Sequence, residues 1–169
     1  MRCRIFNVEH DDLPFILDLN NKFSNEVGLS SIDKMVYFLD KADYFKRIEL
    51  NSINVGFLIA ISPNKDYLSE NYTWFNKKYR SFIYIDRIVI EGAYQNKGLG
   101  KIFYEDLITF SKSSASKRIA CEVNIRPLNE RSITFHDSLG FKEVGQQDTN
   151  QGEKRVSLMA LDIPGDMHV

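Results

Sequence analysis

Apolar residues in the first half of the chain recur at two spacings, one typical of strands and one typical of helices. Residues 4–8 are predicted to form a strand, and residues 44–50 and 55–61, joined by a short asparagine-rich segment, are predicted to form an antiparallel hairpin. Two helices are expected between the first strand and this hairpin, and the second helix begins with a capping box of Ser30 and Asp33. Their apolar residues at helical spacing are Leu13, Ile16, Leu17, Met35, Phe38, Leu39 and Ala42.

Residues 62–80 show neither spacing and are predicted to form a polar loop. The segment is rich in asparagine, yet it also carries the aromatic residues Tyr67, Tyr72, Trp74, Phe75 and Tyr79. We favour the interpretation that these rings pin the loop to the core, because aromatic side chains bury large apolar areas. The alternative is that they line a binding cleft, where they would attract an amine through cation–π contact.

The middle of the chain contains the most regular succession of elements. Residues 84–90 form an apolar strand, residues 95–100 form a short polar turn with two glycines, and an amphipathic helix then runs to Phe110. Another apolar strand follows over residues 118–125. A strand, a helix and a strand within about 40 residues predict a right-handed parallel crossover.

The C-terminal part is predicted to contain one helix and an antiparallel strand pair. Pro127 ends the preceding strand, and Asn129 is placed to cap a helix that ends before Gly140, where a left-handed residue is common. Residues 141–147 and 155–161 are then expected to pair across a polar turn. These elements together indicate one mixed α/β domain over residues 1–169.

Composition narrows the class of protein without naming an activity. The 169 residues are 43% hydrophobic and 27% charged, which is typical of a globular chain, and the net charge of −1 argues against bulk nucleic-acid binding. No apolar run has the length of a signal peptide or a membrane span, so we expect a cytoplasmic protein that binds no membrane. Cys3 and Cys121 lack metal-site spacing and the histidines are scattered, so buried reduced thiols and no metal are expected.

The turn at residues 95–100 is the best candidate for a binding site. A strand that enters a helix through such a turn directs the first helical N–H groups, which lack partners within the helix, toward a ligand such as phosphate. Two glycines alone are weak evidence, because turns need glycine for backbone reasons. Neither the P-loop nor the dinucleotide fingerprint fits, since Gly92 and Gly98 have the wrong separation and no third glycine follows.

The combination of motifs resembles the GNAT acyltransferases, which use acetyl-CoA to acylate amines. The resemblance covers about residues 83–144 and rests on an apolar strand, an amphipathic helix and a second strand, with Gln95-x-x-Gly98-x-Gly100, Asn129 and Leu139-Gly140-Phe141. It implies a central mixed, mostly antiparallel sheet with helices on both faces and a parallel crossover where the sheet splays. It also implies direct acyl transfer from acetyl-CoA to an amine, with no covalent enzyme intermediate and no metal.

The resemblance assigns cofactor contacts to two parts of the chain. The backbone amides of the turn would hold the coenzyme A pyrophosphate, with the Lys97 charge beside it; the turn consists of Gln95, Asn96, Lys97, Gly98, Leu99 and Gly100. Ile88, Val89 and Ile90 would hold the pantetheine arm through their backbone, and one N–H there would polarise the thioester carbonyl. Asn129 and Ser132 would touch the cofactor, although helix capping explains Asn129 equally well.

The family often has a tyrosine as general acid on the helix that precedes the final Gly-Phe. His136 stands at that position in this chain. Histidine can donate a proton near neutral pH, and His136 is therefore our candidate acid. The alternative is a histidine on the helix surface with no part in the reaction.

The general base is assigned to one of two carboxylates. Some family members carry a glutamate where this chain has Asn124, which cannot take up a proton. Glu122 lies on the same strand face two residues earlier, and Asp86 lies on the strand before the turn. Each carboxylate is alternatively a structural ion-pair partner, for example of Arg87 or Arg126, and a base acting through ordered water is a third alternative.

Two other functions remain open at this stage. The missing tyrosine and glutamate favour an alternative in which the same fold binds acyl-CoA as a sensor or partner module without turnover. A purely structural domain, whose turn binds nothing, is the second alternative. For the enzyme we expect a small-molecule or protein amine as acceptor, and a monomer or homodimer.

Overall fold

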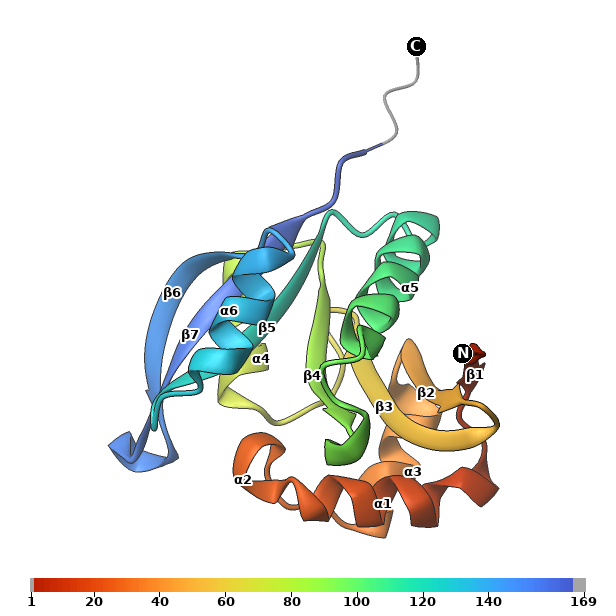
Figure 1. The fold of residues 1–169 in the computed structure, drawn as a ribbon. Helices are drawn as coiled ribbons and strands as arrows, with labels where there is room; N and C mark the ends of the chain where they lie inside the picture. The colour runs from red at the N-terminus through yellow and green to blue at the C-terminus, as the bar shows by residue number, and fades with distance from the viewer. Residues whose placement is uncertain (1, 166–169) are drawn as a thin grey trace. The chain divides into compact units, whose positions relative to one another are not determined.

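The computed structural model describes residues 2–165 of the chain. These residues fall into two compact units, and the chain passes from one to the other after residues 61, 84 and 107. Of the described residues, unit 1 contains 2–61 and 85–107, and unit 2 contains 62–84 and 108–165. Figure 1 shows the helices and strands of both units along the chain. The single domain predicted over residues 1–169 stays a prediction.

Unit 1 contains three strands, three helices and parts of two elements that continue into unit 2. In chain order these are β1 (Cys3–Asn7), α1 (Leu13–Lys22), α2 (Ser24–Val27), α3 (Ile32–Lys41), β2 (Tyr44–Leu50), β3 (Ile53–Ile61), β4 (Ile83–Ile90) and α5 (Leu99–Ser113). Short 3-10 turns at His10–Asp12 and Gly92–Tyr94 precede α1 and α5. Unit 2 adds α4 (Glu70–Lys78), β5 (Arg118–Arg126), α6 (Glu130–Ser138), β6 (Lys142–Thr149), a 3-10 turn (Asn150–Gly152) and β7 (Lys154–Asp162).

The strands form a sheet in the order β1-β2-β3-β4-β5-β7-β6. The pairs β1/β2, β2/β3, β5/β7 and β7/β6 are antiparallel, whereas β4 and β5 are parallel. The parallel ladder is short, because it joins only Ile83 to Ile119 and Tyr84 to Ala120. The predicted fold class, a mixed and mostly antiparallel sheet with one parallel crossover, is confirmed.

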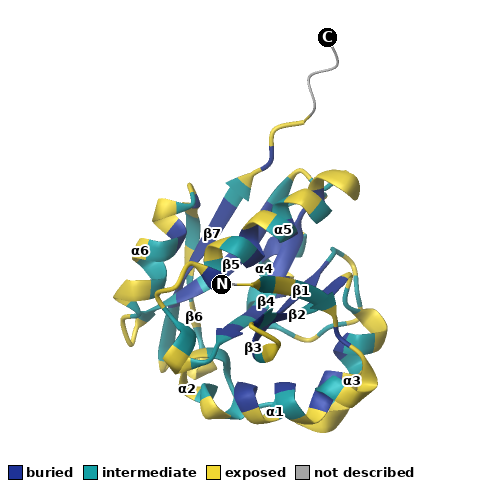
Figure 2. Cartoon of the chain, turned by 45° about the vertical axis from the view of Figure 1, so that its right-hand side comes forward, coloured by how far each residue is buried: buried dark blue, intermediate teal, exposed yellow. Residues whose placement is uncertain are grey.

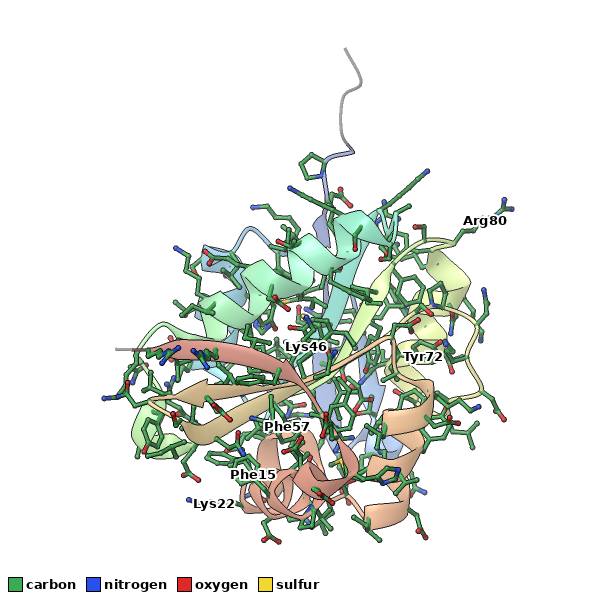
Figure 3. All side chains as sticks on the ribbon, turned by 90° about the vertical axis from the view of Figure 1, so that its right-hand side faces the viewer. Phe15, Lys22, Lys46, Phe57, Tyr72 and Arg80 are labelled. Carbon is green, nitrogen blue, oxygen red and sulfur yellow. The ribbon has the colours of Figure 1, made fainter. Side chains whose placement is uncertain are left out.

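Helices pack on both faces of the strands of unit 1. Figure 3 shows α5 on one side of β1, β2 and β3 and the helices α1 and α3 on the other. Ile16 of α1 and Phe38 of α3 have no exposed surface, and Figure 2 shows that the buried residues of each helix lie on one side of it. On the opposite face, Asp106 of α5 accepts a hydrogen bond from Tyr44 Oη at 2.7 Å. It also forms an ion pair with Lys46 Nζ at 2.8 Å. The sheet of unit 1 is therefore covered on both sides.

Local details differ from the sequence-based predictions at the start of α3 and in the hairpin. Ser31, not Ser30, caps α3, and its side chain accepts a hydrogen bond from Lys34 N. The hairpin turn is tighter than expected, because only Asn51 and Ser52 lie outside the strands, with φ values of 51° and 69°. Such left-handed residues match the right-handed twist of two adjoining strands.

The predicted loop at residues 62–80 contains a helix, α4, which is a correction to the sequence analysis. The side chain of Ser69 caps it by accepting a hydrogen bond from Tyr72 N. Tyr72 and Phe75 are buried, so the favoured interpretation, in which the rings pin this segment to the core, is confirmed. Among the described residues, no helix is both long and apolar enough to span a bilayer.

Candidate functional site

The turn between β4 and α5 has a backbone that only a few residue types adopt readily. Asn96 and Gly98 have φ values of 61° and 79°, in the left-handed region. Gln95 Nε2 donates a hydrogen bond of 2.8 Å to the carbonyl oxygen of Ile90 and so ties the turn to the last residue of β4. The first bond of α5 runs from Ile102 N to Gly98 O at 3.1 Å. The turn is thereby held at both ends.

This geometry suits an anion. The first N–H groups of a helix have no acceptor within the helix, and the helix dipole adds a partial positive charge at the same end. A Cβ built on Gly98 would meet no atom within 4 Å, so the space beside the turn is open. Lys97 is exposed next to it. Residues 95–100, which we call the phosphate turn, therefore fit a pyrophosphate.

Strand β4 presents its backbone groups to alternate edges before it reaches the phosphate turn. Val89 turns its carbonyl toward β3, where a Cβ on Gly56 would come within 2.6 Å of Val89 O, and Glu91 N donates to Val55 O at 2.8 Å. Because backbone groups alternate along a strand, those of Ile88 and Ile90 point to the edge away from β3. Ile88 and Ile90 therefore have their backbone N–H and C=O groups on the edge of β4 away from β3. Val89 has its carbonyl on the opposite edge, toward β3.

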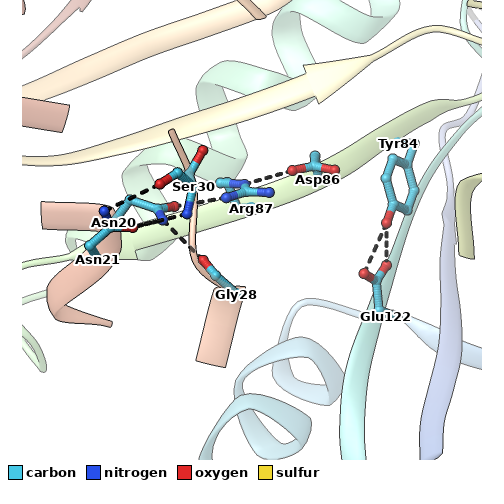
Figure 4. Close-up of polar contacts among 8 residues, drawn as sticks. All are labelled: Asn20, Asn21, Gly28, Ser30, Tyr84, Asp86, Arg87 and Glu122. Carbon is cyan, nitrogen blue, oxygen red and sulfur yellow. Dashed lines mark hydrogen bonds and ion pairs between the residues drawn. The ribbon is translucent and has the colours of Figure 1, made fainter. Parts of the chain in front are cut away.

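Asp86 forms a buried ion pair with its neighbour Arg87 (Figure 4). The Arg87 Nε to Asp86 Oδ2 distance is 2.6 Å, and only 4% of each side chain is exposed. Arg87 also lies over the ring of Phe38 and donates a hydrogen bond of 2.9 Å from Nη1 to Asn20 Oδ1. The alternative that Asp86 is a structural partner of Arg87 is confirmed, and this carboxylate is already engaged.

The same network fixes the segment between α2 and α3. Asn20 Nδ2 donates to Gly28 O at 3.0 Å, while the side chain of Asn21 accepts from Ser30 N at 3.0 Å and donates to Ser30 O at 3.3 Å. Figure 4 shows this chain of contacts leading from β4 to the segment. Arg87 therefore connects β4 to the segment between α2 and α3 within unit 1.

Glu122 of β5 is held by a residue that the sequence analysis did not single out. Tyr84 Oη donates to both carboxylate oxygens, at 2.9 Å from Oε1 and 2.8 Å from Oε2 (Figure 4). The tyrosine is only 1% exposed, whereas Glu122 is half-buried. A half-buried carboxylate oriented by a fixed hydroxyl is a suitable proton acceptor in geometric terms.

His136 is buried in unit 2, so the alternative that placed it on the helix surface is wrong. It is 5% exposed, its Nδ1 lies 2.7 Å from Ser132 O, and the ring of Phe141 meets it edge-on at 5.2 Å. Burial lowers the pKa of His136 below its ordinary value, although the bond to Ser132 O opposes this shift. A general acid has to carry its proton at working pH, and the lowered pKa acts against that role.

Helix α6 begins with the cap that the sequence predicts. Asn129 Oδ1 accepts a hydrogen bond of 3.1 Å from Ser132 N, and Gly140 beyond the helix has a φ of 92°. The capping role of Asn129 is therefore confirmed, while contact of Asn129 and Ser132 with a cofactor stays a prediction.

Neither cysteine has the surroundings of a nucleophile. Cys121 is buried, and burial together with the neighbouring Glu122 charge raises the pKa of its thiol well above the ordinary value. Cys3 is half-buried, and burial raises the pKa of this thiol as well. Within residues 2–165 no group of three or more His, Cys, Asp or Glu side chains is arranged to hold a metal ion.

The buried histidine gives a testable pH dependence. Because the pKa of His136 is lower in the folded chain than its ordinary value of 6.5, the unfolded chain binds more protons as the pH falls below that value. Stability should then be lost toward acid at up to about 1.4 kcal/mol per pH unit from this group. We expect His136→Asn to lose less stability than wild type between pH 7.5 and 5.5 in urea unfolding. An equal loss in both proteins would contradict the assignment.

The sequence profile of the acetyltransferase (GNAT) family matches residues 18–141, about three quarters of the chain. No curated protein sequence matches the chain significantly.

Solved structures of similar fold include two N-acetyltransferases and one protein crystallised with acetyl-CoA. The ribosomal-protein-S18-alanine N-acetyltransferase of Escherichia coli has a TM-score of 0.71 and 19% identity, over 99% of each chain. The yncA protein of Salmonella typhimurium, solved with its cofactor acetyl-CoA, has a TM-score of 0.73 and 15% identity, over 100% of this chain and 98% of its own. The spermidine N-acetyltransferase of Vibrio cholerae, in complex with CoA and spermine, has a TM-score of 0.73 and 18% identity, over 95% of each chain.

Proposed function

This chain belongs to the acetyltransferase (GNAT) family, and from that premise we propose that it transfers the acetyl group of acetyl-CoA directly to an acceptor amine. The observation that carries the proposal is the phosphate turn, in which the left-handed Gly98 opens onto free space at the start of α5. The thioester of acetyl-CoA supplies an activated acetyl group. The side chains and backbone of the protein bind the donor, orient the amine and accept its proton.

The donor would be held by backbone groups of unit 1. The amides of the phosphate turn suit the pyrophosphate, because the first N–H groups of a helix have no acceptor within the helix and the helix dipole adds a partial positive charge there. The backbone groups of Ile88 and the N–H group of Ile90 on the edge away from β3 suit the pantetheine arm, which carries amides of its own; the Ile90 carbonyl already accepts from Gln95 Nε2. The Val89 carbonyl faces β3, so it does not serve the pantetheine arm; the buried Val89 side chain packs in the core instead.

Glu122 is the general base in this proposal. An amine attacks only after it loses the proton that it carries at neutral pH, so a carboxylate has to accept that proton at an Oε atom. Glu122 is half-buried and oriented by Tyr84, whereas Asp86 is paired with Arg87 inside unit 1. His136 has a lowered pKa, so its role as acid stays a prediction with no added support.

The acceptor is an amine whose identity an assay would establish. The similar proteins named above include one that acetylates a protein alanine and one crystallised with spermine, so both protein and small-molecule amines belong in the test. Release of free thiol from acetyl-CoA should be measured with spermidine, free lysine and a peptide with an N-terminal alanine. Turnover of at least one amine is expected. Binding of coenzyme A without turnover of any amine would favour the sensor alternative. A cytoplasmic location stays a prediction.

The phosphate turn predicts a selective loss of cofactor binding in one glycine variant. Gly98→Ala places a Cβ in the open space beside the helix N-terminus and strains a backbone with a φ of 79°. We expect its affinity for coenzyme A, measured by calorimetry, to fall at least about tenfold, because relief of strain would turn the amides away from the phosphates.

Gly152→Ala is the matched control for strain. Gly152 has a φ of 89°, also has open space around it, and lies in the turn before β7. It should lose a similar amount of stability while binding coenzyme A normally. If both variants bind as tightly as wild type, the phosphate turn is not the binding site.

A further inference from the structure

The pair formed by Tyr84 and Glu122 has a geometry that fixes the carboxylate plane. One hydroxyl lies at nearly equal distances, 2.9 and 2.8 Å, from the two oxygens of Glu122. A carboxylate that accepts from one central donor has little freedom to rotate about its terminal bond. An ionised carboxylate has about four acceptor positions, and a single hydroxyl hydrogen does not use all of them.

The register of the parallel strands brings the two side chains together. Tyr84 pairs with Ala120, and Glu122 lies two residues farther along β5 on the same face of the strand. Such diagonal neighbours on adjacent strands are about 7–8 Å apart, which a tyrosine side chain can bridge. The contact arises at the last pair of the β4/β5 ladder, where the sheet hydrogen bonds between these strands end.

Helix α4 holds the ring of Tyr84 in place. The rings of Tyr72 and Phe75, both on α4, lie 5.5 and 5.9 Å from the Tyr84 ring between centroids. Both side chains are buried, so the tyrosine is enclosed by aromatic groups. A ring packed in this way presents its hydroxyl in one direction.

Helix α4 is itself fastened to β6. The ring of Trp74 packs on Gly145, where a Cβ would come within 2.6 Å of the indole. Asn71 Oδ1 accepts a hydrogen bond of 2.8 Å from Gln147 Nε2. A chain of contacts inside unit 2 therefore runs from β6 through α4 and Tyr84 to Glu122.

We infer that Tyr84 is a positioning residue that holds the Glu122 carboxylate in the orientation and ionised form needed to accept a proton. The inference rests on the proposed role of Glu122 as the base. A hydrogen bond donated to a carboxylate stabilises its charged form, and a fixed orientation removes the need to order the group during the reaction. Loss of the hydroxyl should therefore slow the chemical step and leave donor binding intact.

Tyr84→Phe tests the inference with acetyl-CoA and the amine of the panel that wild type turns over fastest. We expect kcat to fall about tenfold, with the KM for acetyl-CoA unchanged, because the phosphate turn is untouched. In a Glu122→Gln background, Tyr84→Phe should cause no further loss, since the group that it positions is no longer a base. A full tenfold loss in both backgrounds would overturn the inference.

Tyr72→Phe is the matched control. Tyr72 is as buried as Tyr84 and packs against it, but its hydroxyl donates to the backbone oxygen of Ser62 at 2.6 Å. This variant removes a buried hydroxyl from the same aromatic cluster, and we expect its kcat to stay within about twofold of wild type. An equal fall of kcat in both variants would assign the effect to packing and overturn the inference.

A second variant covers the case in which Tyr84→Phe does not fold. Replacement of Tyr84 by 4-fluorophenylalanine fills the space of the hydroxyl without donating a hydrogen bond, and its kcat should fall as in the phenylalanine variant. Retention of wild-type kcat by this variant would overturn the inference about Tyr84 and leave the proposed function standing. Absence of wild-type turnover on every amine, or full activity of Glu122→Gln, would remove the base and the inference with it.

Discussion

Glu122→Gln is expected to lower kcat about a hundredfold or more, the largest effect of a single side chain on the reaction. General-base catalysis typically contributes a factor of about 10²–10⁴, and an amide cannot take up the proton of the attacking amine. Glutamine has nearly the same volume as glutamate and still offers an oxygen to Tyr84 Oη, so the surrounding side chains can stay in place. Thiol release at saturating acetyl-CoA measures the change.

Asp86→Asn separates this effect from a general loss of charge. Asp86 was the other candidate base, but its carboxylate is 4% exposed and paired with Arg87. We expect the variant to lose stability while its kcat, measured well below the unfolding temperature, stays within a few-fold of wild type. A loss of kcat as large as that of Glu122→Gln would transfer the role of base to Asp86. Unchanged activity of both variants would favour a base acting through ordered water.

Local sequence patterns predicted most elements of the fold, and they failed where packing decides. The phosphate turn, α5 and the cap at Asn129 depend on neighbouring residues, so periodicity and turn chemistry were sufficient. Helix α4 was missed because its sequence is rich in asparagine and aromatic residues, which have low helix propensity, and because Ser69 has no acidic partner at the third helical position. Burial of Tyr72 and Phe75 stabilises this helix and cannot be inferred from local sequence.

In the candidate site too, local features could be predicted from the sequence and contacts between distant residues could not. The left-handed Gly98 could be predicted from a glycine between a strand and a helix. The contact between Tyr84 and Glu122 could not, because it depends on the register of two parallel strands joined by a long crossover. The signal in the sequence was a tyrosine in a mostly apolar strand, because a buried hydroxyl needs a partner. Burial of His136 likewise follows from the side on which α6 packs.

Arg87→Leu is expected to lower the free energy of unfolding by about 3–5 kcal/mol, the largest effect on stability. Removal of one partner of a buried ion pair leaves the other charge less well compensated, here the Asp86 carboxylate, which then has Lys34 as a remaining cation nearby. The variant also removes the donor to Asn20 Oδ1, which belongs to the network that fixes Gly28 and Ser30. Urea unfolding at pH 7 measures the loss.

A second substitution distinguishes the effect of the buried Asp86 charge on stability from the effect of the lost Arg87 contacts. In the double variant Asp86→Asn, Arg87→Leu the buried charge is gone, so part of the lost stability should return, whereas independent contributions would make the double variant the least stable protein. Arg126→Leu is the control, because its ion pair with Asp148 is exposed and should contribute little. Hydrogen exchange at Ser30 N, which donates to Asn21 Oδ1, should quicken in both Arg87 variants and not in Arg126→Leu, because only Arg87 anchors that segment.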